Sequence, residues 1–178
     1  MMTPSPNSNA VVAIRWHDSP SHGRLDLLDQ TRLPAVFTYL SYDSAASVAE
    51  GIRSMVVRGA PAIGVAAAYG VALEALRLQS LADHEFNIAL DAGFEVLAHS
   101  RPTAVNLFWA LERMQRCRAL LSHQTPAQQA NSLLTEAKAI HAEDIQINLQ
   151  MGQHGAALLA DGARVLTHCN AGALATAG

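Results

Sequence analysis

Three short stretches near the start of the chain have the pattern of β-strands. They alternate polar and apolar positions or are rich in β-branched and aromatic residues, and turn-forming residues separate them. These stretches are residues 11–16, 24–29 and 36–40. From residue 43 onward, apolar positions recur every three or four residues, which is typical of amphipathic helices. The expected helices span about residues 44–57, 61–79, 81–99, 102–122 and 126–160. The pattern predicts a small antiparallel β-meander followed by a helical bundle.

The pattern changes again after a turn at residues 161–162. Residues 164–168 have the composition of a short strand, and a glycine-containing turn and the start of a helix follow them. A strand of this kind needs a parallel partner before it can be buried. We therefore expect a flexible tail at residues 1–10, an N-terminal domain at residues 11–160, and the beginning of a truncated second domain at residues 161–178. The expected fold class is α/β overall.

Composition narrows the kinds of partner. The 178 residues are 50% hydrophobic and 15% charged, with a formal net charge of -3, so a buried core is expected and intrinsic disorder is excluded. Near-balanced charge gives no basic surface for nucleic acid or for an anionic membrane. The longest apolar run, residues 60–76, is interrupted by Pro61, Gly64 and Glu74, which favours a core helix over a membrane span. A small molecule or another protein is the expected partner.

Arg58 lies just before a predicted helix in residues 57–64, with the sequence VRGAPAIG. The free N–H groups of the first helical turn and the guanidinium could converge on one anion, and Gly59 would let the backbone approach it closely. The alternative is that glycine and proline only shape the helix start while Arg58 pairs with a surface acid. Arg101 precedes the predicted fourth helix in the same way, and the two arginines either share an anion or are unrelated.

Cys169 follows the predicted strand at residues 164–168 directly. A cysteine at the junction between a parallel strand and a helix lies where such sheets bind ligands, and the helix dipole can activate the thiol. The alternative is an inert core residue, which is the interpretation we give Cys117. Two separated cysteines build no disulfide framework, so a reducing cytoplasm is expected. The eight histidines lack the spacing of metal ligands, and we expect no metal site.

Five segments, in the same order along the chain, carry a resemblance to a known family. They are residues 27–34 (LLDQTRLP), 57–64 (VRGAPAIG), 100–107 (SRPTAVNL), 147–155 (INLQMGQHG) and 166–175 (LTHCNAGALA). Together they resemble the bacterial methylthioribose-1-phosphate isomerases of methionine salvage. That family shares a superfamily with ribose-1,5-bisphosphate isomerases and with regulatory subunits of the translation-initiation exchange factor. The resemblance implies an N-terminal helical domain and a Rossmann-like C-terminal domain, of which residues 161–178 are the first strand and helix start.

The resemblance also implies an activity and a set of site residues. The reaction would convert 5-methylthioribose 1-phosphate to 5-methylthioribulose 1-phosphate without a cofactor, in a cytoplasmic homodimer. By motif, Cys169 would be catalytic, whereas Arg58, Gly59, Ala60 and Asn170 would bind the substrate. Arg101 would hold the phosphate or hydroxyl groups. The family's catalytic aspartate lies beyond residue 178, so the 178 residues alone are expected to be inactive.

Two alternative functions belong to the same superfamily. An isomerase of ribose 1,5-bisphosphate would need a second basic cluster for its 5-phosphate, and beyond Arg58 and Arg101 the sequence offers no further convergent basic group. A non-catalytic subunit that binds sugar phosphates or nucleotides would have no need of a thiol such as Cys169. The sequence leaves open whether hydrogen moves as a proton or as a hydride.

Overall fold

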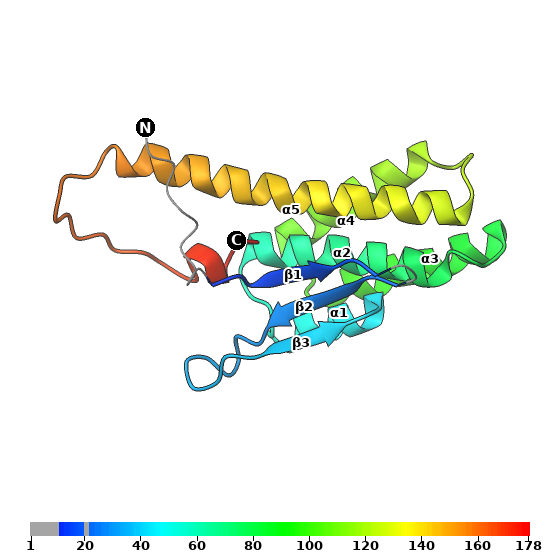
Figure 1. The fold of residues 1–178 in the computed structure, drawn as a ribbon, viewed down its shortest axis with the longest axis horizontal. Coiled ribbons are helices and arrows are strands. Elements are labelled where there is room, and N and C mark those ends of the chain that lie inside the picture. Colours follow the sequence, from blue (N-terminus) through cyan, green and yellow to red (C-terminus); the bar gives the residue numbers. More distant parts are fainter. Residues whose placement is uncertain (1–10, 20–21) are drawn as a thin grey trace.

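The architecture is a small sheet beside a bundle of five helices. The computed structural model describes residues 11–19 and 22–178, so the predicted tail at residues 1–10 lies outside the described part. The elements are β1 (Ile14–His17), β2 (Arg24–Leu28), β3 (Tyr39–Tyr42), α1 (Ala45–Arg53), α2 (Ala60–Leu78), α3 (Asp83–Ala98), α4 (Val105–Leu120), α5 (Pro126–Ala156) and a short 3-10 helix, η1 (Gly172–Leu174). Figure 1 shows the elements in order along the chain.

The three strands form the predicted antiparallel meander, in the order β1-β2-β3. Leu25 and Leu27 of β2 are buried, whereas Asp26 between them is on the opposite face and accepts a hydrogen bond from Ser41. This alternation is the reason for the register of the sheet. The third strand begins later than predicted, at Tyr39, because turn hydrogen bonds such as Val36 N–H to the Arg32 carbonyl close the preceding loop.

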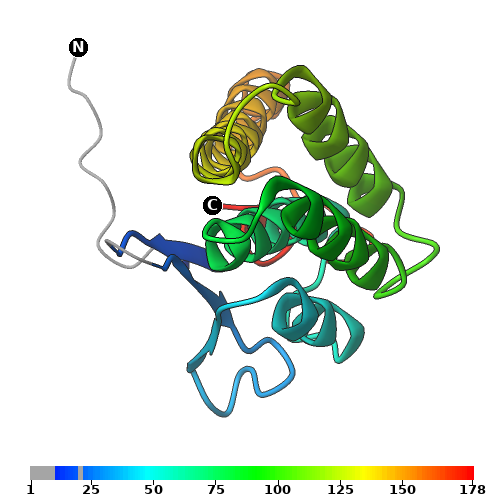
Figure 2. The same ribbon diagram turned by 90° about the vertical axis from the view of Figure 1, so that its right-hand side faces the viewer.

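Helix α2 is the core of the molecule. Every residue from Ala62 to Leu76 is buried, and Figure 2 shows the sheet and α1 on one side of α2 and α4 and α5 on the other. The helix is long and apolar enough to cross a membrane, but 83% of that window is buried inside the protein. A helix that is apolar on all sides and surrounded by other elements is a core helix, as the sequence predicted.

Local capping explains where several helices begin. The Ser44 side chain accepts a hydrogen bond from the Ser47 N–H, and the Ser47 hydroxyl accepts one from the Ser44 N–H. Helix α1 therefore begins at Ala45. Thr125 and Gln128 form the same reciprocal pair at α5. Helix α4 begins at Val105 rather than at residue 102, because the chain first makes a turn in which the Ala104 N–H bonds to the Arg101 carbonyl.

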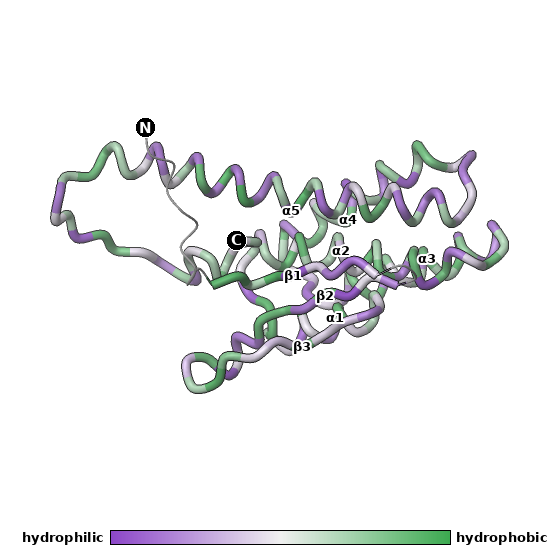
Figure 3. The backbone as a smooth tube through the Cα atoms, viewed as in Figure 1, coloured by the Kyte–Doolittle hydropathy of each residue, from purple (hydrophilic) through white to green (hydrophobic). Residues whose placement is uncertain are grey.

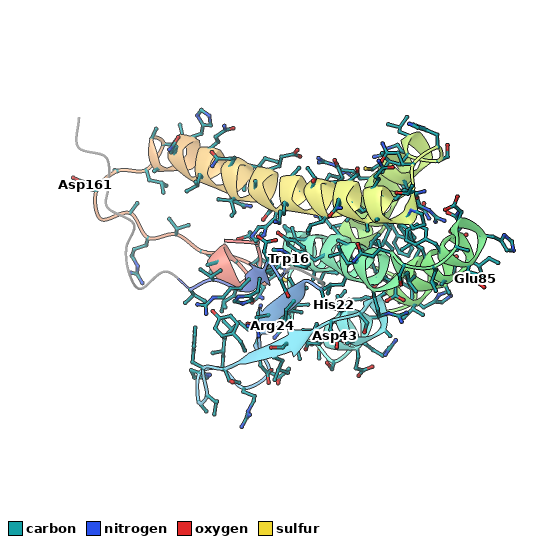
Figure 4. The ribbon with its side chains drawn as sticks, turned by 45° about the vertical axis from the view of Figure 1, so that its right-hand side comes forward. Trp16, His22, Arg24, Asp43, Glu85 and Asp161 are labelled. Atoms are coloured by element: carbon teal, nitrogen blue, oxygen red, sulfur yellow. The ribbon has the colours of Figure 1, made fainter. Side chains whose placement is uncertain are left out.

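The predicted strand at residues 164–168 is not formed. Helix α5 ends at Ala156, and the chain then runs as an exposed, irregular segment in which Val165 and Leu166 are 69% and 97% exposed. Figure 3 shows apolar stretches along this segment, and Figure 4 shows Asp161 at its outer end, away from the bundle. A strand requires a neighbouring strand for its N–H and C=O groups, and none of the described residues provides one here. The helix expected after Cys169 is only η1.

Buried Glu74 links α2 to the start of α1, and we predict that its removal is costly. Its carboxylate accepts a hydrogen bond from the Ala45 N–H at 3.1 Å and pairs with Arg77. Glu74→Ala should lower the free energy of unfolding by about 2 kcal/mol, because hydrogen bonds to a buried charged group are strong. Glu74→Gln, which keeps an acceptor for Ala45, should lose less than half as much. Urea denaturation measures both, and equal losses would contradict the role of the Ala45 bond.

Candidate active site

The turn before α2 presents an unpaired positive charge. Arg58 is exposed and forms no ion pair or hydrogen bond with any residue that the structure describes. The alternative in which Arg58 pairs with a surface acid is therefore wrong for this part of the chain. Gly59 follows as the N-cap residue of α2 with φ +88°, a left-handed conformation that glycine adopts without strain.

Backbone donors accompany this arginine at the helix start. Pro61 has no N–H group, and the Ala62 N–H donates to the Ala175 carbonyl at 3.2 Å. Among the described residues, the N–H groups of Gly59 and Ala60 have no hydrogen-bond acceptor. Two free N–H groups, a guanidinium and the positive end of a helix dipole are the components of an anion site.

Ala175, in the segment that follows Cys169, lies against this helix start. A Cβ atom added at Gly59 would be 2.4 Å from the Ala175 Cα atom, so only glycine permits this approach. Figure 1 shows the chain leaving α5, extending outward and returning to the start of α2 and β1. The contact brings residues that are more than 100 positions apart in sequence to one end of the molecule.

Gln30 joins this returning segment to the sheet and to the Arg58 turn. Its side-chain amide donates to the Leu174 carbonyl at 2.7 Å, and its side-chain oxygen accepts from Asn170 at 3.4 Å. Its backbone N–H donates to the Val56 carbonyl at 3.1 Å, two residues before Arg58. Asn170, and with it the neighbouring Cys169, is therefore brought to the same end of the molecule as the turn before α2.

Cys169 is exposed and has a left-handed backbone conformation, with φ +63°. The predicted position at a junction between a strand and an α-helix is wrong in this structure, because neither element forms around it. The thiol is not enclosed in the core, so the interpretation as an inert core residue is also wrong. Cys117, by contrast, packs against the core, and burial raises the pKa of its thiol.

Arg101 lies in the turn before α4 and forms no ion pair with any described residue. The first turn of α4 packs closely on α2, since a Cβ atom at Gly64 would be 2.8 Å from the Asn106 carbonyl oxygen. Arg101 is thus five residues from a direct contact with the second turn of α2. An anion shared by Arg58 and Arg101 stays a prediction.

A groove of about 430 Å³ opens beside the start of α2. Its walls come from α2, α4 and α5, and they are mostly apolar and contain no lysine, arginine or histidine. The lining residues are Pro61, Gly64, Val65, Val105, Asn106, Trp109, Ile140, Glu143, Asp144, Ile147, Asn148 and Met151. Pro61, the residue that follows Ala60 at the helix start, forms part of the groove wall.

Helix α5 holds the end of the returning segment through two side chains that sequence reasoning missed. Asp144 accepts a hydrogen bond from the Ala177 N–H at 2.8 Å, and His141 Nε2 lies 3.1 Å from the Ala177 carbonyl oxygen. The other ring nitrogen of His141 lies 2.9 Å from the Tyr69 hydroxyl. Burial lowers the pKa of His141, which favours a neutral ring that donates from Nε2 and accepts from Tyr69. Gln30 lay within a recognised segment, but no sequence signal marked His141 or Asp144.

Comparison with known proteins assigns the class. The model of the Initiation factor 2 subunit family matches residues 56–177, and the chain belongs to that family. The matched region includes the start of α2, the returning segment and Cys169.

Particular relatives are isomerases. The chain is 60% identical over 169 residues to the methylthioribose-1-phosphate isomerase of Albidiferax ferrireducens. The matched region covers 95% of this chain and 47% of the relative. It is 50% identical to the 5-deoxyribose 1-phosphate isomerase of Bacillus cereus, covering 93% of this chain and 47% of that protein. The resemblance to methylthioribose-1-phosphate isomerases is thereby confirmed. The chain spans about half the length of the curated relatives it matches.

Two solved structures share the fold. The 5-methylthioribose 1-phosphate isomerase from Pyrococcus horikoshii has a TM-score of 0.86 at 37% identity, covering 95% of this chain and 46% of that one. Subunit delta of the translation initiation factor eIF-2B from A. fulgidus has a TM-score of 0.80 at 40% identity, covering 94% and 47%. The mixed α/β fold of the sheet and helical bundle is therefore shared by an enzyme and an initiation factor subunit.

We predict that Gly59→Ala destabilises the protein. A side chain at residue 59 strains the left-handed backbone by about 1–2 kcal/mol and also collides with Ala175. Gly152→Ala is the matched control, because an added Cβ there meets nothing within 4 Å and α5 gains helix propensity. Urea denaturation should show a lower free energy of unfolding for Gly59→Ala and an unchanged or higher one for Gly152→Ala. Equal stability of the two variants would contradict the close contact.

Proposed function

We propose that these residues form the N-terminal part of an aldose-ketose isomerase that converts 5-methylthioribose 1-phosphate to 5-methylthioribulose 1-phosphate. The observation that carries the proposal is the contact between two segments. The turn with unpaired Arg58 and free N–H groups lies against the segment that follows Cys169. An anion-binding turn beside an exposed thiol suits a phosphorylated substrate that reacts near its phosphate.

The phosphate on C1 of the sugar would bind at the start of α2. The guanidinium of Arg58 and the N–H groups of Gly59 and Ala60 would donate to its oxygens, with Arg101 as a further cation. Asn170, next to Cys169, would donate to a substrate hydroxyl. This grip matters because the reaction must keep the phosphate on C1 while the ring opens.

The isomerisation is balanced within the substrate. An acid protonates the ring oxygen and the bond between C1 and that oxygen breaks. One hydrogen then moves from C2 to C1, and the C2 hydroxyl becomes a ketone as its proton returns to the conjugate base of that acid. Cys169 would lie beside C1 and C2, where a thiolate can accept the C2 proton and return it to C1. No outside oxidant or reductant is required, and we propose no cofactor.

Residues 11–160 would be the N-terminal domain, and residues 161–178 would begin a Rossmann-like domain that supplies the acid. The relatives are about twice as long as this chain. The segment at residues 164–168 is exposed, which is consistent with a strand whose partner strands are not among the described residues. We propose a cytoplasmic homodimer that acts on a small sugar phosphate, with no nucleic acid or membrane partner.

The groove beside α2 favours an apolar group at C5 of the sugar. Its walls include Trp109, Ile147 and Met151 and contain no basic residue. Burial of a methylthio group there would lower the free energy of binding, whereas a second phosphate would have no cation to pair with. This supports a methylthio or 5-deoxy sugar over ribose 1,5-bisphosphate.

Turnover by the full-length protein that contains these residues tests the function. We expect isomerisation of 5-methylthioribose 1-phosphate, with slower turnover of ribose 1,5-bisphosphate, and 5-deoxyribose 1-phosphate serves as the third substrate. Cys169→Ser should lower kcat at least about 100-fold if the thiol transfers the proton, whereas Cys117→Ser should leave it unchanged.

Full activity of Cys169→Ser would remove the thiol from the mechanism. Preference for the bisphosphate would reassign the substrate, and no turnover of any of the three sugars would favour a non-catalytic subunit.

A further inference from the structure

We propose that Gln30, Asp144 and His141 form a clamp that positions Cys169 by holding the backbone of residues 174–177. This inference rests on the proposed function, since it concerns the thiol of that reaction. Gln30 lies in the turn after β2, and Asp144 and His141 lie on α5. The three are positioning residues that do not themselves touch the substrate's reacting atoms.

Each of the three side chains forms a hydrogen bond with a backbone group of residues 174–177. Gln30 donates to the Leu174 carbonyl at 2.7 Å, Asp144 accepts from the Ala177 N–H at 2.8 Å, and His141 lies 3.1 Å from the Ala177 carbonyl oxygen. The N–H and C=O groups of Ala177 thus both have hydrogen-bond partners within the protein. This matters because Ala177 is only 1% exposed, so water cannot take their place. Loss of a partner would leave a buried donor or acceptor unpaired, which favours release of the segment.

The position of Cys169 depends on this downstream anchoring. All residues from 151 to 169 are exposed, so the chain between α5 and the thiol has no buried anchor. Asn170 is the first residue after it with a long-range hydrogen bond, to Gln30. The thiol is therefore held from its C-terminal side, by residues 170–177.

The third member of the clamp is itself held in place. His141 accepts from the Tyr69 hydroxyl in the buried core, and the Tyr69 ring stacks on Trp16 with 5.0 Å between ring centroids. Tyr69 belongs to α2, the same helix whose start receives the Ala175 carbonyl. The clamp and the proposed phosphate site thus share one rigid helix, which would fix the thiol relative to the bound phosphate.

The experiment compares amide exchange and kinetics in full-length variants. Asp144→Ala and Gln30→Ala should each raise hydrogen exchange at residues 174–177 by about tenfold or more, as expected for loss of a partly buried hydrogen bond. We expect kcat to fall by a similar factor, about tenfold. The inhibition constant of inorganic phosphate should change less than about threefold, because the proposed phosphate ligands stay in place.

Two control variants separate positioning from general damage. Asp144→Asn keeps an oxygen that accepts the Ala177 N–H, so it should restore both exchange protection and most of kcat. Gln146→Ala, at an exposed position of the same helix, should leave exchange and kinetics unchanged.

Unchanged exchange in Asp144→Ala and Gln30→Ala, or raised exchange with unaltered kcat, would overturn the clamp. If either alanine variant fails to fold, the other one and Asp144→Asn still decide. A wild-type protein without isomerase activity would defeat the proposed function instead, and the exchange data would then test the docking of residues 174–177 separately.

Discussion

The close approach of the Ala175 backbone to the start of α2 is the contact on which the rest of the site depends. It exists because residue 59 has no side chain and adopts a left-handed conformation, which lets the Ala175 backbone lie where a Cβ atom would otherwise be. The Ala175 carbonyl takes one N–H group of the helix start, and the groups before it stay free. One glycine therefore both admits the segment and leaves backbone donors for an anion.

Rigid placement of this contact comes from the burial of α2. A helix that is covered on every side cannot shift without disturbing its neighbours, since protein interiors are close-packed. Its first turns meet α4 at Gly64 and the returning segment at Gly59, and its middle is joined to α5 through Tyr69 and His141. The proposed phosphate ligands and the segment beside Cys169 are thus both attached to one rigid helix. A site that binds a phosphate ester next to a reactive group needs such a fixed distance between the two.

Sequence reasoning succeeded where local chemistry decides the structure. Ser44 as a cap, Pro61 in the first turn of α2 and the alternation in β2 all act through neighbours in the chain. It failed at residues 164–168, because a strand depends on a partner that local sequence does not contain. It also missed Asp144 and His141. These side chains bind backbone groups of residue 177, and every residue has such groups, so the sequence gives no signal for the contact. The placement of Arg58 and Asn170 at one end of the molecule was expected only from the family resemblance.

The central claim is that Arg58 and Cys169 belong to one site, and ligand protection of the thiol tests it most directly. The rate of Cys169 alkylation in the full-length protein should fall about tenfold when 5-methylthioribose 1-phosphate is present at about ten times its Kd, because the occupied fraction sets the rate. The rate at Cys117 should not change, and the protection should disappear in Arg58→Ala at the same ligand concentration. Alkylation of Cys169 that is unaffected by saturating ligand, or protection that persists at that concentration without Arg58, would contradict the account.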